Sequence, residues 1–113
     1  MTNKILFVCM VVAAFIFLTA WSCYAQDKHS YKPKSGYVPN EATAVLVAEA
    51  ILRPIYSDKV VEDEKPFHAE LSDGIWTVTG TLHCPGSERC LGGVGVVEIS
   101  KDDGKIVRVS HGK

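Results

Sequence analysis

The sequence contains none of the short motifs that mark many enzyme active sites. It has no nucleophile motif between a strand and a helix. It also has no phosphate-binding glycine loop, because Gly92-Gly93 leads into a β-rich run and not into a helix. The histidines belong to no nucleophile–base–acid pattern. They are His29, His68, His83 and His111. These absences predict a protein that is not an enzyme and binds no cofactor.

Basic residues are too few and too scattered for a nucleic-acid-binding protein. The chain has 12 basic and 13 acidic residues, a formal net charge of −1. Residues 1–25 contain a single charged residue, Lys4, so the rest of the chain has 11 basic and 13 acidic residues and a net charge of −2. Basic residues do not alternate with aromatic ones anywhere. We therefore exclude nucleic acid as a partner.

Cysteine is scarce after the N-terminal segment. Residues 26–113 contain only Cys84 and Cys90. Their spacing differs from the Cys-x-x-Cys pattern of redox pairs, and with His83 they offer only three candidate metal ligands. The loop between them is rich in turn residues, and a disulfide across it would contribute about 2 kcal/mol by the chain-entropy estimate. We prefer a Cys84–Cys90 disulfide over a redox pair or a metal site.

Residues 1–25 have the pattern of a secretory signal peptide. Lys4 precedes fourteen apolar residues, 5–18, and a smaller, more polar stretch, 19–25, follows them. The apolar run is shorter than the about 20 residues that a membrane-spanning helix needs. The pattern predicts export to the periplasm or secretion.

Processing of this segment has three alternatives. Cleavage after Ala25 would use Cys23 and Ala25 as the small residues before the cut. Lipidation of Cys23 would instead anchor a lipoprotein to the membrane, although the bulky Trp21 before it is unfavourable there. The third is an uncleaved anchor. Contact with a membrane is expected only if Cys23 is lipidated.

Residues 26–39 are polar and include two prolines. Aliphatic residues are missing until Val38, which predicts a flexible tether ahead of a single domain at residues 40–113.

A helix is predicted at the start of this domain. Asn40 is a suitable N-cap, and residues 41–53 contain strong helix formers without glycine or proline. Glu49 and Arg53 are spaced to form an ion pair on its surface. Pro54 would end the regular pattern or start a further turn.

Four β-rich runs follow, and two Asp-Gly pairs suggest tight turns within them. The runs are residues 67–72, 75–82, 94–99 and 105–109, and the turns are Asp73-Gly74 and Asp103-Gly104. Their alternation of apolar and polar residues predicts antiparallel strands with one face buried. The fold class is therefore α+β, with one main helix packed on a four-stranded antiparallel sheet.

The alternation assigns a direction to each side chain of the sheet. Phe67, Ala69 and Leu71 share one face, as do Val97 with Ile99 and Val107 with Val109. Trp76 is expected to anchor the core, although a register shift by one residue would make it an exposed binding residue. Gly80 suggests a bulge, a bend or a close approach of another chain segment.

Residues 57–66 are predicted to be a connector, in which Val60-Val61 forms a short strand or anchors the loop. The acidic run Glu62, Asp63 and Glu64 is either a solvated turn or a patch for a basic protein partner.

The order of several short motifs resembles the NTF2-fold immunity protein family of the YbbC/YhhH type, which is associated with Rhs toxin elements. These motifs are Gly36-Tyr37-Val38-Pro39, Ala48-Glu49-Ala50-Ile51-Leu52, Pro54-Ile55-Tyr56, Lys65-Pro66-Phe67, Gly74-Ile75-Trp76-Thr77-Val78, Gly92-Gly93-Val94, Glu98-Ile99-Ser100 and Asp103-Gly104-Lys105 through to Lys113. The resemblance implies a cystatin/NTF2-like fold with a curved sheet, shorter than a full NTF2 domain. The Cys84–Cys90 loop departs from the family pattern.

The resemblance further implies an exported immunity protein that binds and neutralises a cognate Rhs-type toxin. Candidate partner-binding residues are Glu62, Asp63, Glu64, His68, Glu70, Glu88 and Arg89. Two alternatives remain. One is a periplasmic inhibitor or regulatory module of a hydrolase, similar to PepSY or lysozyme-inhibitor domains. The other is an NTF2-like small-ligand binder, which requires an apolar pocket.

Overall fold

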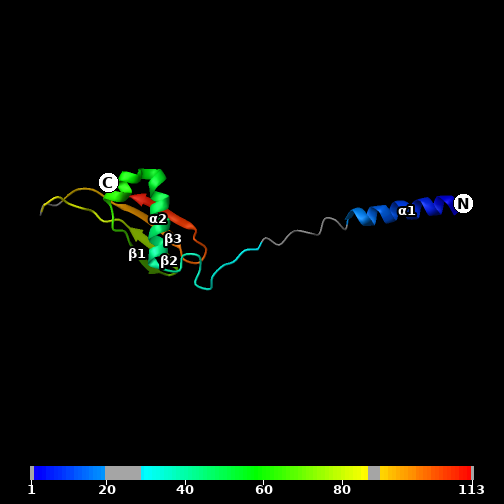
Figure 1. Ribbon diagram of the computed structural model, residues 1–113, viewed down its shortest axis with the longest axis horizontal. Coiled ribbons are helices and arrows are strands. Elements are labelled where there is room, and N and C mark those ends of the chain that lie inside the picture. Colours follow the sequence, from blue (N-terminus) through cyan, green and yellow to red (C-terminus); the bar gives the residue numbers. More distant parts are fainter. Residues whose placement is uncertain (1, 20–28, 87–89, 113) are drawn as a thin grey trace. The chain divides into compact units, whose positions relative to one another are not determined.

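Figure 1 shows the computed structural model, which describes residues 2–19, 29–86 and 90–112. The chain divides into two compact units, Met1–Tyr31 and Lys32–Lys113. The first contains helix α1 (Thr2–Thr19). Within the described ranges, no helix has both the length and the apolar character needed to cross a membrane. Cys23 and the expected cleavage site lie outside these ranges, so the signal peptide stays a prediction.

The unit Lys32–Lys113 consists of two helices and a four-stranded antiparallel sheet (Figure 1). The strands lie in the order β1-β2-β3-β4. In chain order the elements are α2 (Glu41–Tyr56), α3 (Asp58–Asp63), β1 (His68–Ser72), β2 (Ile75–Thr79), β3 (Gly95–Ser100) and β4 (Ile106–His111). Helix α2 packs against β1, β2 and β3. The α+β fold class predicted from the sequence is therefore confirmed.

Helix α2 begins where its capping residue predicts. The Asn40 side chain accepts a hydrogen bond from the Thr43 backbone N–H at 2.9 Å, which satisfies one of the free donors of the first turn. Pro54 does not end the helix, which continues to Tyr56. Pro54 has no N–H to donate to the Ala50 carbonyl, so the helix continues there with one backbone hydrogen bond fewer.

The first hairpin has the register that Asp73-Gly74 predicts, with Ser72 opposite Ile75 and Leu71 opposite Trp76. Trp76 is buried, and its indole N–H donates to the Val38 carbonyl at 2.8 Å. The strand thus has the expected register, with Trp76 as a core anchor.

Strand β4 departs from strict alternation. Val107 is 52% exposed, because the register of β3 with β4 shifts between Glu98 and Ile99, and Ile106 packs on the core in its place. The prediction that Val107 shares the buried face with Val109 is therefore wrong. Leu71 lies on its predicted face, opposite the buried Trp76, but is 46% exposed near the end of β1.

The core fills the space between α2 and the sheet. Its residues are exposed by 8% or less, and the largest fully buried side chains come from α2, α3, β2 and β3. They are Val38, Ala44, Ala48, Leu52, Val61, Phe67, Trp76, Val78, Val97 and Ile99. A ligand-binding cone of the NTF2 type would lie in this space, so its filling argues against the small-ligand alternative.

The expected connector at residues 57–66 contains helix α3, which corrects the prediction of a turn. The Ser57 side chain accepts a hydrogen bond from the Val60 N–H at 3.4 Å at the start of this helix. Val61 is fully buried and fastens α3 to the core. Val60-Val61 therefore anchors the segment as helix and not as a strand.

The expected tether is shorter than residues 26–39, because its second half packs on the domain. The backbone N–H groups of Tyr37 and Val38 donate to the carbonyls of Asp102 and Lys101, each at 3.0 Å. Gly36 has φ +85°, and a Cβ there would lie 2.9 Å from the Asp102 Cα. This close approach requires glycine.

Candidate functional site

One face of the sheet carries polar and β-branched side chains and lies opposite α2. We call it the open face. Its central cross-strand row joins Glu70, Thr77, Glu98 and Arg108, and the neighbouring row joins His68, Thr79, Val96 and Ser110. These side chains are exposed or half-buried. An exposed sheet face of mixed polar and β-branched side chains can contact another protein.

Glu98 and Arg108 form the strongest polar contact on the open face. Arg108 Nε and Nη2 donate to the two carboxylate oxygens, each at 3.1 Å. This pairing lowers the pKa of Glu98 and raises that of Arg108 from their ordinary values. The pair joins β3 to β4 across the open face.

The segment between β2 and β3 carries the Cys84–Cys90 disulfide, with the two Cα atoms 5.3 Å apart. Its first part is held by three contacts to the α3–β1 connection. The Thr81 N–H donates to the Glu64 carbonyl at 2.7 Å, the Thr81 hydroxyl contacts the Pro66 carbonyl, and the His83 ring contacts the Lys65 carbonyl at 2.6 Å. The base of the loop is thereby fixed at one end of the sheet.

Glu64 lies at this same end and is buried, with 8% exposure. One carboxylate oxygen accepts the Gly95 N–H at 2.9 Å, and the other lies 2.5 Å from His111 Nε2. A Cβ at Gly80 would approach that carboxylate to 3.0 Å. Of the three roles expected for Gly80, the structure shows the close approach of another chain segment. Strand β2 ends just before it, at Thr79.

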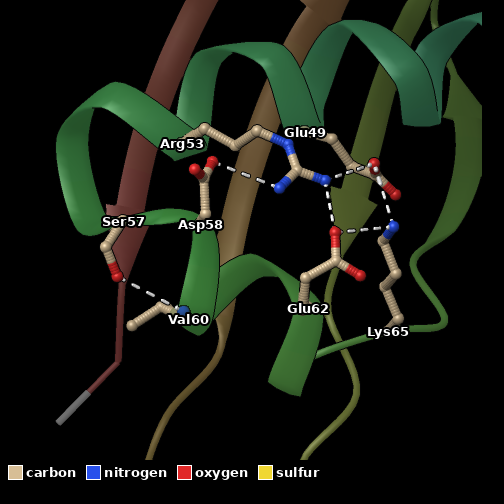
Figure 2. Close-up of polar contacts among 7 residues, drawn as sticks. All are labelled: Glu49, Arg53, Ser57, Asp58, Val60, Glu62 and Lys65. Carbon is tan, nitrogen blue, oxygen red and sulfur yellow. Dashed lines mark hydrogen bonds and ion pairs between the residues drawn. The ribbon is translucent and has the colours of Figure 1, made fainter.

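Glu62 belongs to a separate charge network, which Figure 2 shows beside α2 and α3. Arg53 contacts Glu62 at 2.7 Å, Asp58 at 3.3 Å and Glu49 at 3.4 Å, the last being the expected surface pair. Lys65 also contacts Glu62, at 3.0 Å. The hydrogen bond from Arg53 holds the pKa of Glu62 below its ordinary value.

The three residues of the acidic run lie in different surroundings. Glu62 pairs with Arg53, Asp63 with Lys59, and Glu64 points into the protein. Glu64 is therefore unavailable as a surface contact. The partner-binding roles of Glu62 and Asp63 stay predictions.

The remaining predicted contact residues fall into two groups. His68 and Glu70 are exposed on the open face of β1. Glu88 and Arg89 lie outside the described residues. Sequence reasoning missed His111, and the signal for it was weak, because its partner Glu64 is 47 residues away in the chain.

The described residues contain no cluster of three or more His, Cys, Asp or Glu side chains that could hold a metal ion. The His111 ring is engaged by Glu64 on one nitrogen and by the Gly112 carbonyl on the other, at 2.8 Å. This arrangement fastens the C-terminal end of β4 and performs a structural role.

A family model described as NTF2 fold immunity protein matches residues 43–113, which include α3, the whole sheet and nearly all of α2. The chain belongs to this family. Uncharacterized protein YhhH of Escherichia coli (strain K12) is 34% identical over 98% of this chain and 93% of its own length. Uncharacterized protein YbbC of the same organism is 33% identical over 96% of this chain and 89% of its own. No solved structure matches significantly.

The resemblance noted from the short motifs is thereby confirmed. An NTF2 fold immunity protein is expected to act by binding a protein partner. The fold itself does not assign the function.

Proposed function

We propose that this NTF2 fold immunity protein is exported and neutralises a cognate Rhs-type toxin by binding it. The observation that carries the proposal is the family match over residues 43–113. This chain neutralises the toxin by covering its surface and catalyses no reaction. The partner is therefore a folded protein domain.

The open face supports this proposal as the docking surface. Its side chains stand on rigid strands, so little conformational entropy is lost when a partner binds. Arg108 and Glu98 already hold each other in place, and Thr77 and Thr79 offer hydroxyl groups beside them. A partner therefore binds to this preorganised surface with a higher affinity than the buried area alone would give.

Export rests on the signal-like pattern of residues 1–25, and the disulfide is consistent with an oxidising compartment. The mature protein then resides in the periplasm or is secreted. Lipidation at Cys23 is the alternative. Mass spectrometry of the mature N-terminus separates these routes, because a lipidated Cys23 carries a diacylglycerol mass that a chain beginning at Gln26 lacks.

Co-expression tests the proposal directly. The toxin gene that neighbours this gene is expressed with an export signal, with or without this chain, and growth is recorded. We expect the chain to restore growth, and a chain without residues 2–25 to give no protection in the periplasm. Death of cells that contain the folded, exported chain would refute neutralisation.

Affinity capture distinguishes the hydrolase alternative. A tagged chain is incubated with the purified toxin domain and separately with periplasmic hydrolases from the same cell. A stoichiometric complex with the toxin alone supports the immunity role. A complex with a hydrolase, together with loss of the hydrolase activity, would assign the protein to the inhibitor class.

A further inference from the structure

A second surface lies where α2 meets the outer edge of β1. An open groove of about 720 Å³ is formed there by the first half of α2 together with Phe67. Most of its side chains are apolar, and Leu46 is 68% exposed. The residues that form it are Asn40, Glu41, Ala42, Val45, Leu46 and Phe67.

Strand β1 borders this region and is an edge strand of the sheet. The Ala69 N–H points away from β2, because it donates to the Glu41 carboxylate at 3.3 Å. Residues two apart in a strand direct their backbone groups the same way, so the N–H and C=O of Leu71 also point outward. The edge thus offers a row of backbone groups for pairing.

If a further strand paired with β1, one of its backbone carbonyl oxygens would accept the hydrogen bond from the Ala69 N–H. The Glu41 carboxylate occupies that position and accepts this hydrogen bond instead. The Glu41 side chain is exposed at the first turn of α2, so it can turn aside at low cost. The Glu41 side chain therefore covers the edge of β1 but can move aside, so this edge can still pair with an added strand.

The segments that form this edge and its groove carry acidic but no Lys or Arg side chains. Residues 40–50 and 66–74 contain no lysine or arginine. Glu49 is neutralised by Arg53 and Lys65, whereas Glu70 on the outward face of β1 is exposed. A basic side chain opposite Glu70 would therefore find an unoccupied acidic partner.

We propose that an extended segment of a partner protein adds to the edge of β1 as a further antiparallel strand. Its alternate apolar side chains enter the groove beside Leu46, and its intervening lysine or arginine side chains face Glu70. The alternation of a strand requires this division between the two faces. The proposal holds whether or not the partner is a toxin, and Glu70 is the one residue that it shares with the open face.

Fluorescence polarisation with two fluorescein-labelled octapeptides tests the proposal on the full-length chain. One peptide alternates valine with lysine, and the other alternates valine with glutamate. We expect the lysine peptide to bind at least about tenfold more tightly. Glu70→Lys should weaken the lysine peptide about fivefold and strengthen the glutamate peptide. An unchanged preference in this variant would overturn the proposed pairing.

The groove is tested by Leu46→Asp, with Ile55→Asp as the matched control. Both residues are exposed aliphatic side chains of α2, but Ile55 lies outside the groove. We expect Leu46→Asp to weaken binding about tenfold and Ile55→Asp to leave it unchanged. Equal effects of the two substitutions, or no binding of the lysine peptide to the unaltered chain, would overturn the proposal.

The backbone contact is tested by Leu71→Pro against Leu71→Ala. Proline removes the outward N–H and leaves the pairing with β2 intact, so binding should be lost in Leu71→Pro and weakened less in Leu71→Ala. Circular dichroism verifies the fold, and the Leu46 and Glu70 variants carry the test if Leu71→Pro unfolds. Light scattering tests whether a second copy of this chain occupies the groove. A dimer that dissociates in the Leu46→Asp variant would show that the occupant is a second copy and not a partner segment.

Discussion

The two faces of the sheet differ sharply although they alternate along the same strands. Toward α2, the side chains of β2 and β3 are exposed by 8% or less; they are Trp76, Val78, Val97 and Ile99. On the open face their immediate neighbours are only half-buried; these are Thr77, Thr79, Val96 and Glu98. Stability is thus expected to depend on one face, which leaves the other free to recognise a partner.

The strongest test of this contrast compares Ile99→Ala with Ile75→Ala. Both are isoleucines of central strands, but Ile99 is fully buried while Ile75 is half-buried on the open face. We expect Ile99→Ala to lower the free energy of unfolding by about 3 kcal/mol, because it leaves a cavity. Ile75→Ala should cost less than about 1 kcal/mol. Equal losses in urea denaturation would show that the open face also supports the fold.

The second test uses the two glutamates at either end of the acidic run. Glu64→Ala removes the buried acceptor of Gly95 and the partner of His111, so we expect a loss of about 2 kcal/mol. Glu62→Ala removes exposed pairs that solvent screens, and its effect should be far smaller. Thermal unfolding at low and high salt measures both. A larger loss for Glu62 would contradict the structural role assigned to Glu64.

The third test seeks an effect on binding with little effect on stability. Val96→Arg places a long charged side chain in the middle of the open face, and Ile55→Arg is the control on α2. We expect each to change the free energy of unfolding by less than about 1 kcal/mol. Only Val96→Arg should abolish protection in the co-expression assay. Full protection by this variant would place the toxin elsewhere on the protein.

Local signals were sufficient to predict the main helix and the first hairpin. The Asn40 cap, the Asp73-Gly74 turn and the alternation around Trp76 each act over a few residues, and each has the predicted geometry.

The sequence could not predict features that depend on distant contacts. The burial of Glu64 requires the missing side chains of Gly80 and Gly95, which are 16 and 31 residues away. The packing of Val38 depends on the Lys101 carbonyl in a turn near the C-terminus. Helix α3 was missed because six residues give too short a pattern to distinguish a helix from a loop.

The smallest expected effect concerns the one ion pair that we find central to the open face. Arg108 lowers the pKa of Glu98, so the pair contributes stability above the unfolded-state pKa of a glutamate and loses it as pH falls through the folded-state pKa. In an NMR titration, the Glu98 carboxyl should titrate at lower pH than in Arg108→Met, and salt should reduce the difference. Because both groups are exposed, the accompanying change in stability should be slight. Identical titrations in the two proteins would show that the pair does not persist in solution. The open face would then be less preorganised for its partner than the two hydrogen bonds from Arg108 indicate.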